Sequence, residues 1–219
     1  MADVVIFGIR ENSSLAHFYF DHDSEHRVVA FTLDAEHLEG PTFEGLPVIP
    51  FETLEESYGP DRCSLFAPLS PRKMNQVREE VYGRGKEKGY DFVSYVSSRA
   101  TVFPGAEIGE NCFVLEDNTI QPFTTIGDNV VLWSGNHIGH HGAIRDHVFF
   151  TSHVVLSGRC DVQPHSFFGV NATIRDGLRI AEGTLVGMGA CVTRDTEPWG
   201  VYTGNPAKKG DVLSKDLDF

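Results

Sequence analysis

Histidines are concentrated in one short stretch of this 219-residue chain. Six of the ten lie between positions 137 and 165: His137, His140, His141, His147, His153 and His165. Imidazole is the side chain best suited to accept and return a proton near neutral pH. The cluster therefore points to general acid–base chemistry, and the next question is which elements hold it in place.

The cluster lies inside a long six-residue repeat. Every sixth residue from Val96 to Val192 is apolar, which makes seventeen consecutive matches. The position four residues after each match is mostly small or apolar, as at Ala100 and Cys112. A gap of two residues from there to the next match places both side chains on one side of a short strand. A sustained period of six indicates stacked β-coils, and in this register His140 and His141 fall on a corner that projects from the coil.

This stretch resembles the hexapeptide-repeat family, whose fold is a left-handed parallel β-helix with three hexapeptides in each triangular coil. One outward column of the repeat is uniformly apolar, and a bare stripe of that kind predicts an association surface. Family members are commonly trimers, so we expect a homotrimer through this stripe. Its members are Tyr95, Phe113, Val131, Phe149, Phe167 and Leu185. The alternative is that the N-terminal domain or the tail covers the stripe.

The segment from Asn136 to Asp146 resembles the active-site repeat of sugar acetyltransferases in the sialic-acid O-acetyltransferase and bacillosamine N-acetyltransferase group. The match places His140 on the catalytic histidine. His141 stands where the family has Asp or Glu, so Asp146 or a neighbouring subunit would have to orient the base. We expect the Gly158 N–H to stabilise the oxyanion.

The C-terminal segment from Val186 to Lys209, with Gly-Asn-Pro-Ala-Lys near its end, resembles the closing coil and tail of hexapeptide acetyltransferases. The resemblance implies acetyl-CoA as co-substrate. It also implies that the pantetheine arm lies along Gly158, Val170 and Met188, that Phe149 lies near the thioester, and that Lys208 and Lys209 meet the phosphates.

The N-terminal half reads as alternating strands and helices. Strands are expected near 4–7, 28–31 and 63–67, helices near 15–20, 52–57 and 73–88, and a Gly/Pro-rich loop from 40 to 50. This order suggests a small Rossmann-like parallel sheet, and it is similar to the nucleotide-sugar-binding domain attached to these transferases. The residues expected to contact substrate are Gly8, Arg10, Ser13, Ser14 and Asp34.

The composition limits the classes of partner that the chain is expected to bind. The formal net charge is −13, which disfavours binding to nucleic acid or an anionic membrane through the general field. Four separated cysteines without a C-x-x-C pair fit free thiols in a reducing cytosol, and no signal peptide or membrane-length apolar run is recognised. No metal site is expected, because no two histidines of the repeat have the five-residue separation of the γ-class carbonic anhydrases.

We therefore expect a Rossmann-like domain over residues 1–93, a left-handed β-helix over 94–198 and a tail over 199–219. The predicted function is acetyl transfer from acetyl-CoA to a nucleotide-linked amino sugar, with a role in polysaccharide biosynthesis in the cytoplasm implied by the resemblance. Two alternatives stay open, a sugar O-acetyltransferase of the sialic-acid type and a non-catalytic β-helix scaffold.

Overall fold

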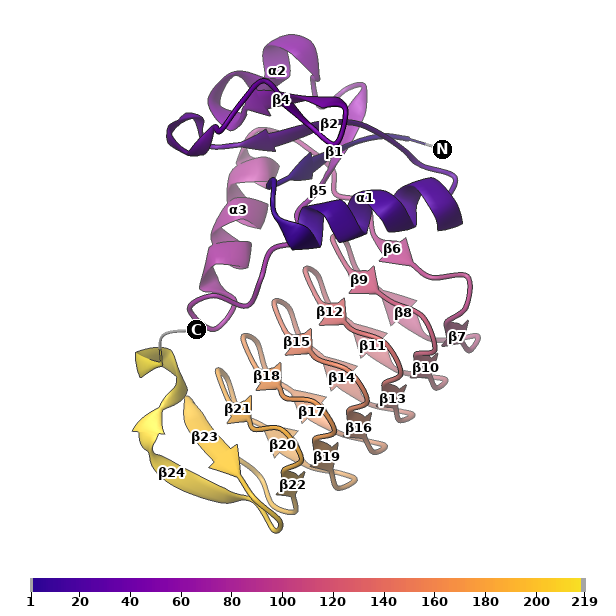
Figure 1. Ribbon diagram of the computed structural model, residues 1–219. Coiled ribbons are helices and arrows are strands. Elements are labelled where there is room, and N and C mark those ends of the chain that lie inside the picture. The colour runs from indigo at the N-terminus through magenta and orange to yellow at the C-terminus, as the bar shows by residue number, and fades with distance from the viewer. Residues whose placement is uncertain (1, 218–219) are drawn as a thin grey trace.

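A computed structural model describes residues 2–217 of the chain (Figure 1). The N-terminal part is a five-stranded sheet of order β3-β4-β2-β1-β5, in which β1, β2, β4 and β5 run parallel. Its strands are β1 (Asp3–Phe7), β2 (Arg27–Leu33), β3 (Thr42–Phe43), β4 (Leu46–Pro50) and β5 (Cys63–Phe66). Its helices are α1 (Glu11–Asp23), α2 (Leu54–Ser57) and α3 (Gln76–Glu87), with short 3₁₀ turns η1 (Ala35–His37) and η2 (Phe51–Thr53). The predicted small parallel sheet is confirmed.

The segment from 40 to 50 was expected to be a loop, and this was wrong. It contains the hairpin β3–β4, whose turn is made by Glu44 and Gly45, both with positive φ. Gly45 takes φ 81°, a conformation that glycine adopts without steric cost. The error came from Pro47 and Pro50, because proline is uncommon within strands. Both are tolerated in β4 because this strand lies near the edge of the sheet.

Residues 95–192 form a parallel β-helix of seventeen two-residue strands, as the six-residue period predicts. Each strand ends on one of the seventeen apolar positions. The first face holds β6 (Tyr95–Val96), β9 (Phe113–Val114), β12 (Val131–Leu132), β15 (Phe149–Phe150), β18 (Phe167–Phe168) and β21 (Leu185–Val186). The second, the β13 face, holds β7 (Thr101–Val102), β10 (Thr119–Ile120), β13 (His137–Ile138), β16 (Val155–Leu156), β19 (Thr173–Ile174) and β22 (Cys191–Val192). The third, the β14 face, holds β8 (Glu107–Ile108), β11 (Thr125–Ile126), β14 (Ala143–Ile144), β17 (Asp161–Val162) and β20 (Arg179–Ile180).

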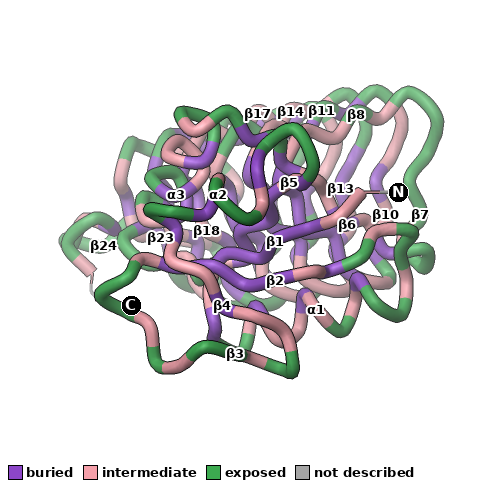
Figure 2. Tube along the Cα trace, turned by 90° about the horizontal axis from the view of Figure 1, so that it is seen from above, coloured by how far each residue is buried: buried purple, intermediate pink, exposed green. Residues whose placement is uncertain are grey.

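The repeat folds this way because it fills a narrow interior. The second residue of most strands is fully buried, and Phe150 and Phe168 stack there with ring centroids 4.3 Å apart. The corners turn tightly through residues with positive φ, such as His141 at 55° and Asn129 at 57°. Figure 2 shows buried residues along the middle of the prism and exposed ones along its outer turns.

The apolar stripe lies on the first face, and the N-terminal domain covers it. Tyr95, Phe113, Val131 and Phe149 are at most 4% exposed and belong to one hydrophobic core with β1, α1 and β5. Phe167 packs against the same core, and Leu185 is half-buried. The prediction that this stripe joins copies into a trimer was therefore wrong, because an apolar column cannot reveal whether its own chain covers it. We call it the covered face (Figure 1).

Two helices sit at the two edges of the covered face. At the edge toward the β13 face, Asp23 of α1 accepts hydrogen bonds from the Tyr95 hydroxyl at 2.8 Å and the Ser98 N–H at 2.9 Å. At the edge toward the β14 face, Arg78 of α3 is fully buried and donates to Asn129 Oδ1 at 3.1 Å. We call these the α1 edge and the α3 edge. The third edge lies between the two remaining faces, opposite the domain.

The tail continues the covered face. Strand β23 (Gly200–Thr203) pairs in parallel with β21, and β24 (Lys208–Leu213) pairs antiparallel with β23 before the 3₁₀ turn η3 (Ser214–Asp216). The predicted domain bounds at 93 and 198 stay predictions. Within residues 2–217, no helix has the length and apolar character needed to cross a bilayer.

Candidate active site

His140 and His141 lie on the third edge, opposite the N-terminal domain, in the turn between β13 and β14. We call it the His140 edge. The two Nδ1 atoms are 3.0 Å apart and the rings are nearly perpendicular, so one imidazole donates to the other. Positive φ at His141 turns the two neighbouring side chains toward each other. The resulting pair is exposed at the surface of a single chain.

His140 is placed by the coils on either side. Its N–H donates to Gln121 Oε1 at 3.0 Å, and its carbonyl accepts from the Arg159 N–H at 2.8 Å. The ring lies over Gly158, where a methyl group would come within 3.1 Å of His140 Nε2. Within residues 2–217 the Gly158 N–H has no hydrogen-bond partner. The His140 ring and an amide donor with no partner in this range thus lie side by side, and the roles expected for His140 and Gly158 stay predictions.

His141 follows His140 directly, and its ring packs on Phe123 of the preceding coil with centroids 4.7 Å apart. Phe123 is 62% exposed. The contact limits how far the His141 ring can turn. An imidazole therefore holds the place where the resemblance led us to expect a carboxylate.

Asp146 does not orient His140. It lies on the α3 edge, where its carboxylate accepts the Asp128 N–H at 2.9 Å, while Asp128 accepts the Glu110 N–H at 2.8 Å. These contacts close successive turns of the coil. The predicted role for Asp146 within its own chain was wrong, because six residues along the repeat move a side chain to the next edge.

Phe149 was expected beside the thioester, and this was also wrong. It is 4% exposed on the covered face, and the Arg78 guanidinium lies 5.6 Å from its ring centroid. A coenzyme cannot reach it without displacing α3. Burial lowers the pKa of Arg78 to about 9, which reflects the cost of placing a guanidinium at this junction without a carboxylate.

The other residues expected to bind the coenzyme lie on two different edges. Val170 and Met188 are 40% and 81% exposed on the α1 edge, one coil apart, whereas Gly158 lies on the His140 edge. Lys208 and Lys209 line a cavity of about 380 Å³ that also includes Arg194. Lys209 is paired with Glu197, whose hydrogen bond raises the pKa of the amine.

The N-terminal domain has a second cavity system where its parallel strands end. β1 pairs with β2 on one side and with β5 on the other. The chain adds β2 and β4 on the first side before it returns to add β5, so the strand order reverses at β1. Open parallel sheets bind ligands at such a reversal, beyond the carboxyl ends of the strands. Cavities of about 490 and 360 Å³ lie there, and both include Gly8, Arg10, Leu69 and Arg72 in their walls.

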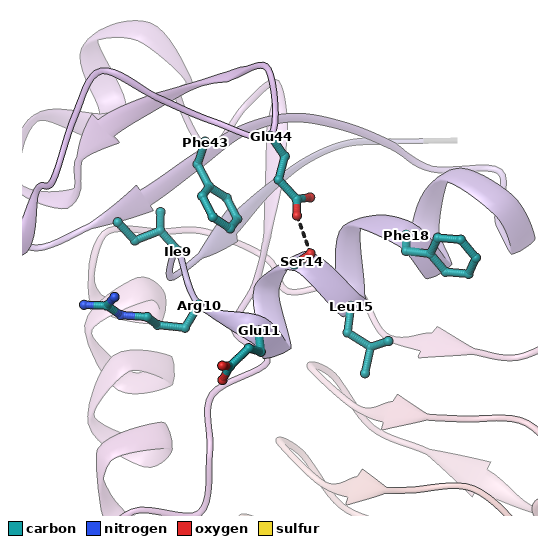
Figure 3. A pocket seen from close by; sticks show the side chains of 8 residues that line it. All are labelled: Ile9, Arg10, Glu11, Ser14, Leu15, Phe18, Phe43 and Glu44. Atoms are coloured by element: carbon teal, nitrogen blue, oxygen red, sulfur yellow. Dashed lines mark hydrogen bonds between the residues drawn. The ribbon is translucent and has the colours of Figure 1, made fainter.

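The predicted substrate residues gather around these cavities, although several already have partners. Gly8 has φ 111°, and a methyl group on it would come within 2.7 Å of the buried Ser13 hydroxyl, so the turn itself requires glycine. Arg10 pairs with Glu39. Ser14 donates to Glu44, a contact drawn in Figure 3, and lines a third cavity of about 550 Å³ with Phe18 and Phe43.

Asp34 at the end of β2 also has a partner that the sequence did not predict. Arg84 of α3 donates to both of its oxygens, with Nη1 to Oδ2 at 3.1 Å. That hydrogen bonding lowers the pKa of Asp34. The carboxylate is thus ionised and partly engaged before any ligand arrives.

Sequence reasoning missed Arg72, which lines both the 490 Å³ and the 360 Å³ cavity of the N-terminal domain. The only signal available was its place a few residues beyond the third predicted strand, where a parallel sheet presents its loops. No group of three or more His, Cys, Asp or Glu residues in the described range is arranged to hold a metal ion.

Comparisons with known proteins agree with the fold. Residues 105–140 match the family model "Bacterial transferase hexapeptide (six repeats)". The chain is 31% identical to SACOL2570 of Staphylococcus aureus (strain COL) over 61 residues, which are 28% of this chain and 31% of that protein. It is 40% identical to a chloramphenicol acetyltransferase of Klebsiella aerogenes over 43 residues, 20% of each chain. The match thus spans about a third or less of these relatives.

Solved structures align over nearly the whole chain. PerB from Caulobacter crescentus, in complex with CoA and GDP-perosamine, has a TM-score of 0.83 at 24% identity, covering 96% of this chain and 98% of that one. The acetyltransferase domain of PglB from Neisseria gonorrhoeae FA1090 has a TM-score of 0.82 at 21% identity, covering 95% and 100%. The chain thus has the fold of these solved structures, a small parallel α/β sheet followed by a left-handed β-helix, and residues 105–140 of that helix are similar to the bacterial transferase hexapeptide model.

Proposed function

We propose that the chain is an acetyltransferase that moves an acetyl group from acetyl-CoA to the amine of a nucleotide-linked sugar. One observation carries the proposal, namely that the His140 ring lies over Gly158, whose N–H has no partner within residues 2–217, while His140 Nδ1 contacts His141. Transfer of an acyl group to an amine needs a base and an oxyanion donor, and these two groups lie together on one exposed edge.

The chemistry follows from those positions. His140 Nε2 accepts the proton as the amine nitrogen bonds to the thioester carbon. The Gly158 N–H donates to the carbonyl oxygen as it gains negative charge. When the carbon–sulfur bond breaks, the imidazolium of His140 returns its proton to the leaving thiolate. A base of this kind contributes about 10² to 10⁴ in rate.

The His140 edge also leads toward the basic cavity of the tail. Arg194 stands 54 residues after His140, which is three coils of eighteen on the same edge. At about 4.8 Å per coil, the cavity with Lys208 and Lys209 lies on the order of 14 Å along the edge from the base. The phosphates of an extended coenzyme fit there.

A second copy of the chain is needed to complete this site. The N-terminal domain covers the face opposite the His140 edge, so a sugar bound there cannot reach the histidine of the same chain. Val170 and Met188 lie on the α1 edge, and one coenzyme can contact them together with Gly158 only where edges of two copies meet. We therefore keep the homotrimer as a proposal and place its contact on the β13 face. Exposed apolar residues on that face and its two edges include Val102, Phe103, Phe123, Val155, Val170 and Met188.

Incubation with acetyl-CoA and a panel of nucleotide-linked amino sugars, with detection of released thiol, tests the activity. His140→Ala and His140→Asn should lower turnover by 10² to 10⁴ while leaving the affinity for acetyl-CoA nearly unchanged. Unchanged turnover would refute the role of His140. Acetylation of a sugar hydroxyl in place of an amine, read from the product, would favour the O-acetyltransferase alternative, and no thiol release with any acceptor would favour the scaffold.

A further inference from the structure

The loop after β5 carries an arginine at the wall shared by two cavities of the N-terminal domain. Arg72 lines both the 490 Å³ and the 360 Å³ cavity, together with Gly8, Arg10 and Leu69. It is exposed, and within residues 2–217 it has no ion pair or hydrogen bond. An unpaired guanidinium at a cavity wall is available to a ligand.

The surrounding charges make this arginine distinctive. Asp34, Glu36 and Glu39 line the larger cavity, and Glu11 lines the smaller one. Arg10, the other arginine in both walls, pairs with Glu39, and Arg84 pairs with the Asp34 of the larger cavity. An anionic ligand entering an acidic cavity of a chain with net charge −13 needs a cation that is not already paired.

The backbone beside Arg72 is held in an unusual conformation. Lys73, Met74 and Asn75 follow with φ of 50°, 51° and 67°, although left-handed geometry is sterically unfavourable for a residue other than glycine. Met74 and Asn75 are fully buried. The Asn75 amide donates to the His165 carbonyl at 3.3 Å and its Oδ1 accepts from Arg78 Nη1 at 3.0 Å.

These contacts fix the turn against the β-helix and start α3 only at Gln76. Arg72 is thereby kept outside the helix and at the cavity wall. Costly backbone geometry that is held by buried neighbours is frequent at functional sites.

We propose that Arg72 binds the diphosphate of the nucleotide-linked sugar, an assignment that rests on the proposed function. A guanidinium binds two phosphate oxygens in parallel, which matches a diphosphate better than a point charge does. The acidic residues of the wall repel a diphosphate that Arg72 does not bind, so this side chain determines whether the nucleotide binds.

Calorimetric titration with GDP and UDP as probes tests this role, with guanosine and uridine as uncharged references. Arg72→Gln should weaken binding of the diphosphate at least tenfold and change nucleoside binding little, and Arg72→Lys should recover part of the loss. Arg62→Gln is the matched control, because Arg62 is an exposed arginine just before the opposite end of β5. Equal thermal midpoints for all variants would establish that folding is intact.

The outcomes separate the two proposals. If the wild-type protein binds a diphosphate and Arg72→Gln binds it equally well, the assignment of Arg72 is overturned while the proposed function stands. If the wild-type protein binds neither diphosphate yet releases thiol with a sugar acceptor, the nucleotide class and Arg72 are overturned together. An equal loss for diphosphate and nucleoside would also overturn it, since that pattern reports a disturbed cavity.

Discussion

Replacing His141 should distinguish the proposed role of His141, which orients the base, from the proposed role of His140, which is the base. The chemistry proposed for His140 requires a free Nε2, so its Nδ1 must carry the hydrogen that is donated to His141 Nδ1, 3.0 Å away. His141→Ala removes that acceptor. A hydrogen bond between neutral groups contributes about 1 kcal/mol, which corresponds to about a fivefold loss of turnover.

That loss is far smaller than the 10² to 10⁴ expected for His140→Ala. The affinity for acetyl-CoA should stay the same in both variants, because neither change alters Gly158. Thiol release under saturating coenzyme gives turnover, and its dependence on coenzyme concentration gives the affinity. His22→Ala is the control, since His22 is an exposed histidine on α1 whose Nδ1 contacts the Phe18 carbonyl.

His141→Glu should restore turnover, because a carboxylate also accepts the hydrogen bond from His140 Nδ1. A His141→Ala loss as large as that of His140→Ala would refute the reasoning, and so would a His141→Glu variant that turns over no faster than His141→Ala.

Two further predictions concern the fold, and a third concerns the contact between copies. Hydrogen bonds from Ser98, Tyr95 and Ser97 lower the pKa of Asp23 from 3.8 to about 2, so its contribution to stability is present above pH 4 and lost as the pH falls toward 2. Urea midpoints of Asp23→Asn should therefore differ from those of the wild-type protein at pH 6 and converge with them near pH 2, and a constant difference would contradict this. Phe113→Ala should lower the free energy of unfolding by about 3–5 kcal/mol because Phe113 is 3% exposed on the covered face. Val155→Glu, on the β13 face, should leave the thermal midpoint of the chain nearly unchanged and reduce the mass measured by light scattering, and an unchanged mass would place the contact elsewhere.

The β-helix was predictable because its constraint is local and repeated. Each strand has room for one inward residue of apolar type, so seventeen apolar residues at a fixed spacing specify seventeen strands. The same register placed His140 on a corner and Gly158 one coil below it. Both positions follow from arithmetic on the period and need no tertiary information.

The errors arose where the answer depends on a distant part of the chain. The column with Phe113 and Phe149 is apolar whether a second copy or the N-terminal domain covers it, and the domain does. Asp146 is close to His140 in sequence but lies on the next edge. Arg72 belongs to no motif, and its position depends on a left-handed turn held by His165, ninety residues away.

The repeat also explains why the chemistry lies at an edge. The interior is too narrow for anything but small and apolar side chains, and the covered face is sealed by aromatic residues of two domains. A titratable pair that must meet a substrate therefore has only the corners and the two free faces. The edge opposite the N-terminal domain is the one that the domain cannot block. Under the proposed function, its distance from the cavities of the N-terminal domain is what calls for a neighbouring copy to bring the sugar to the histidine.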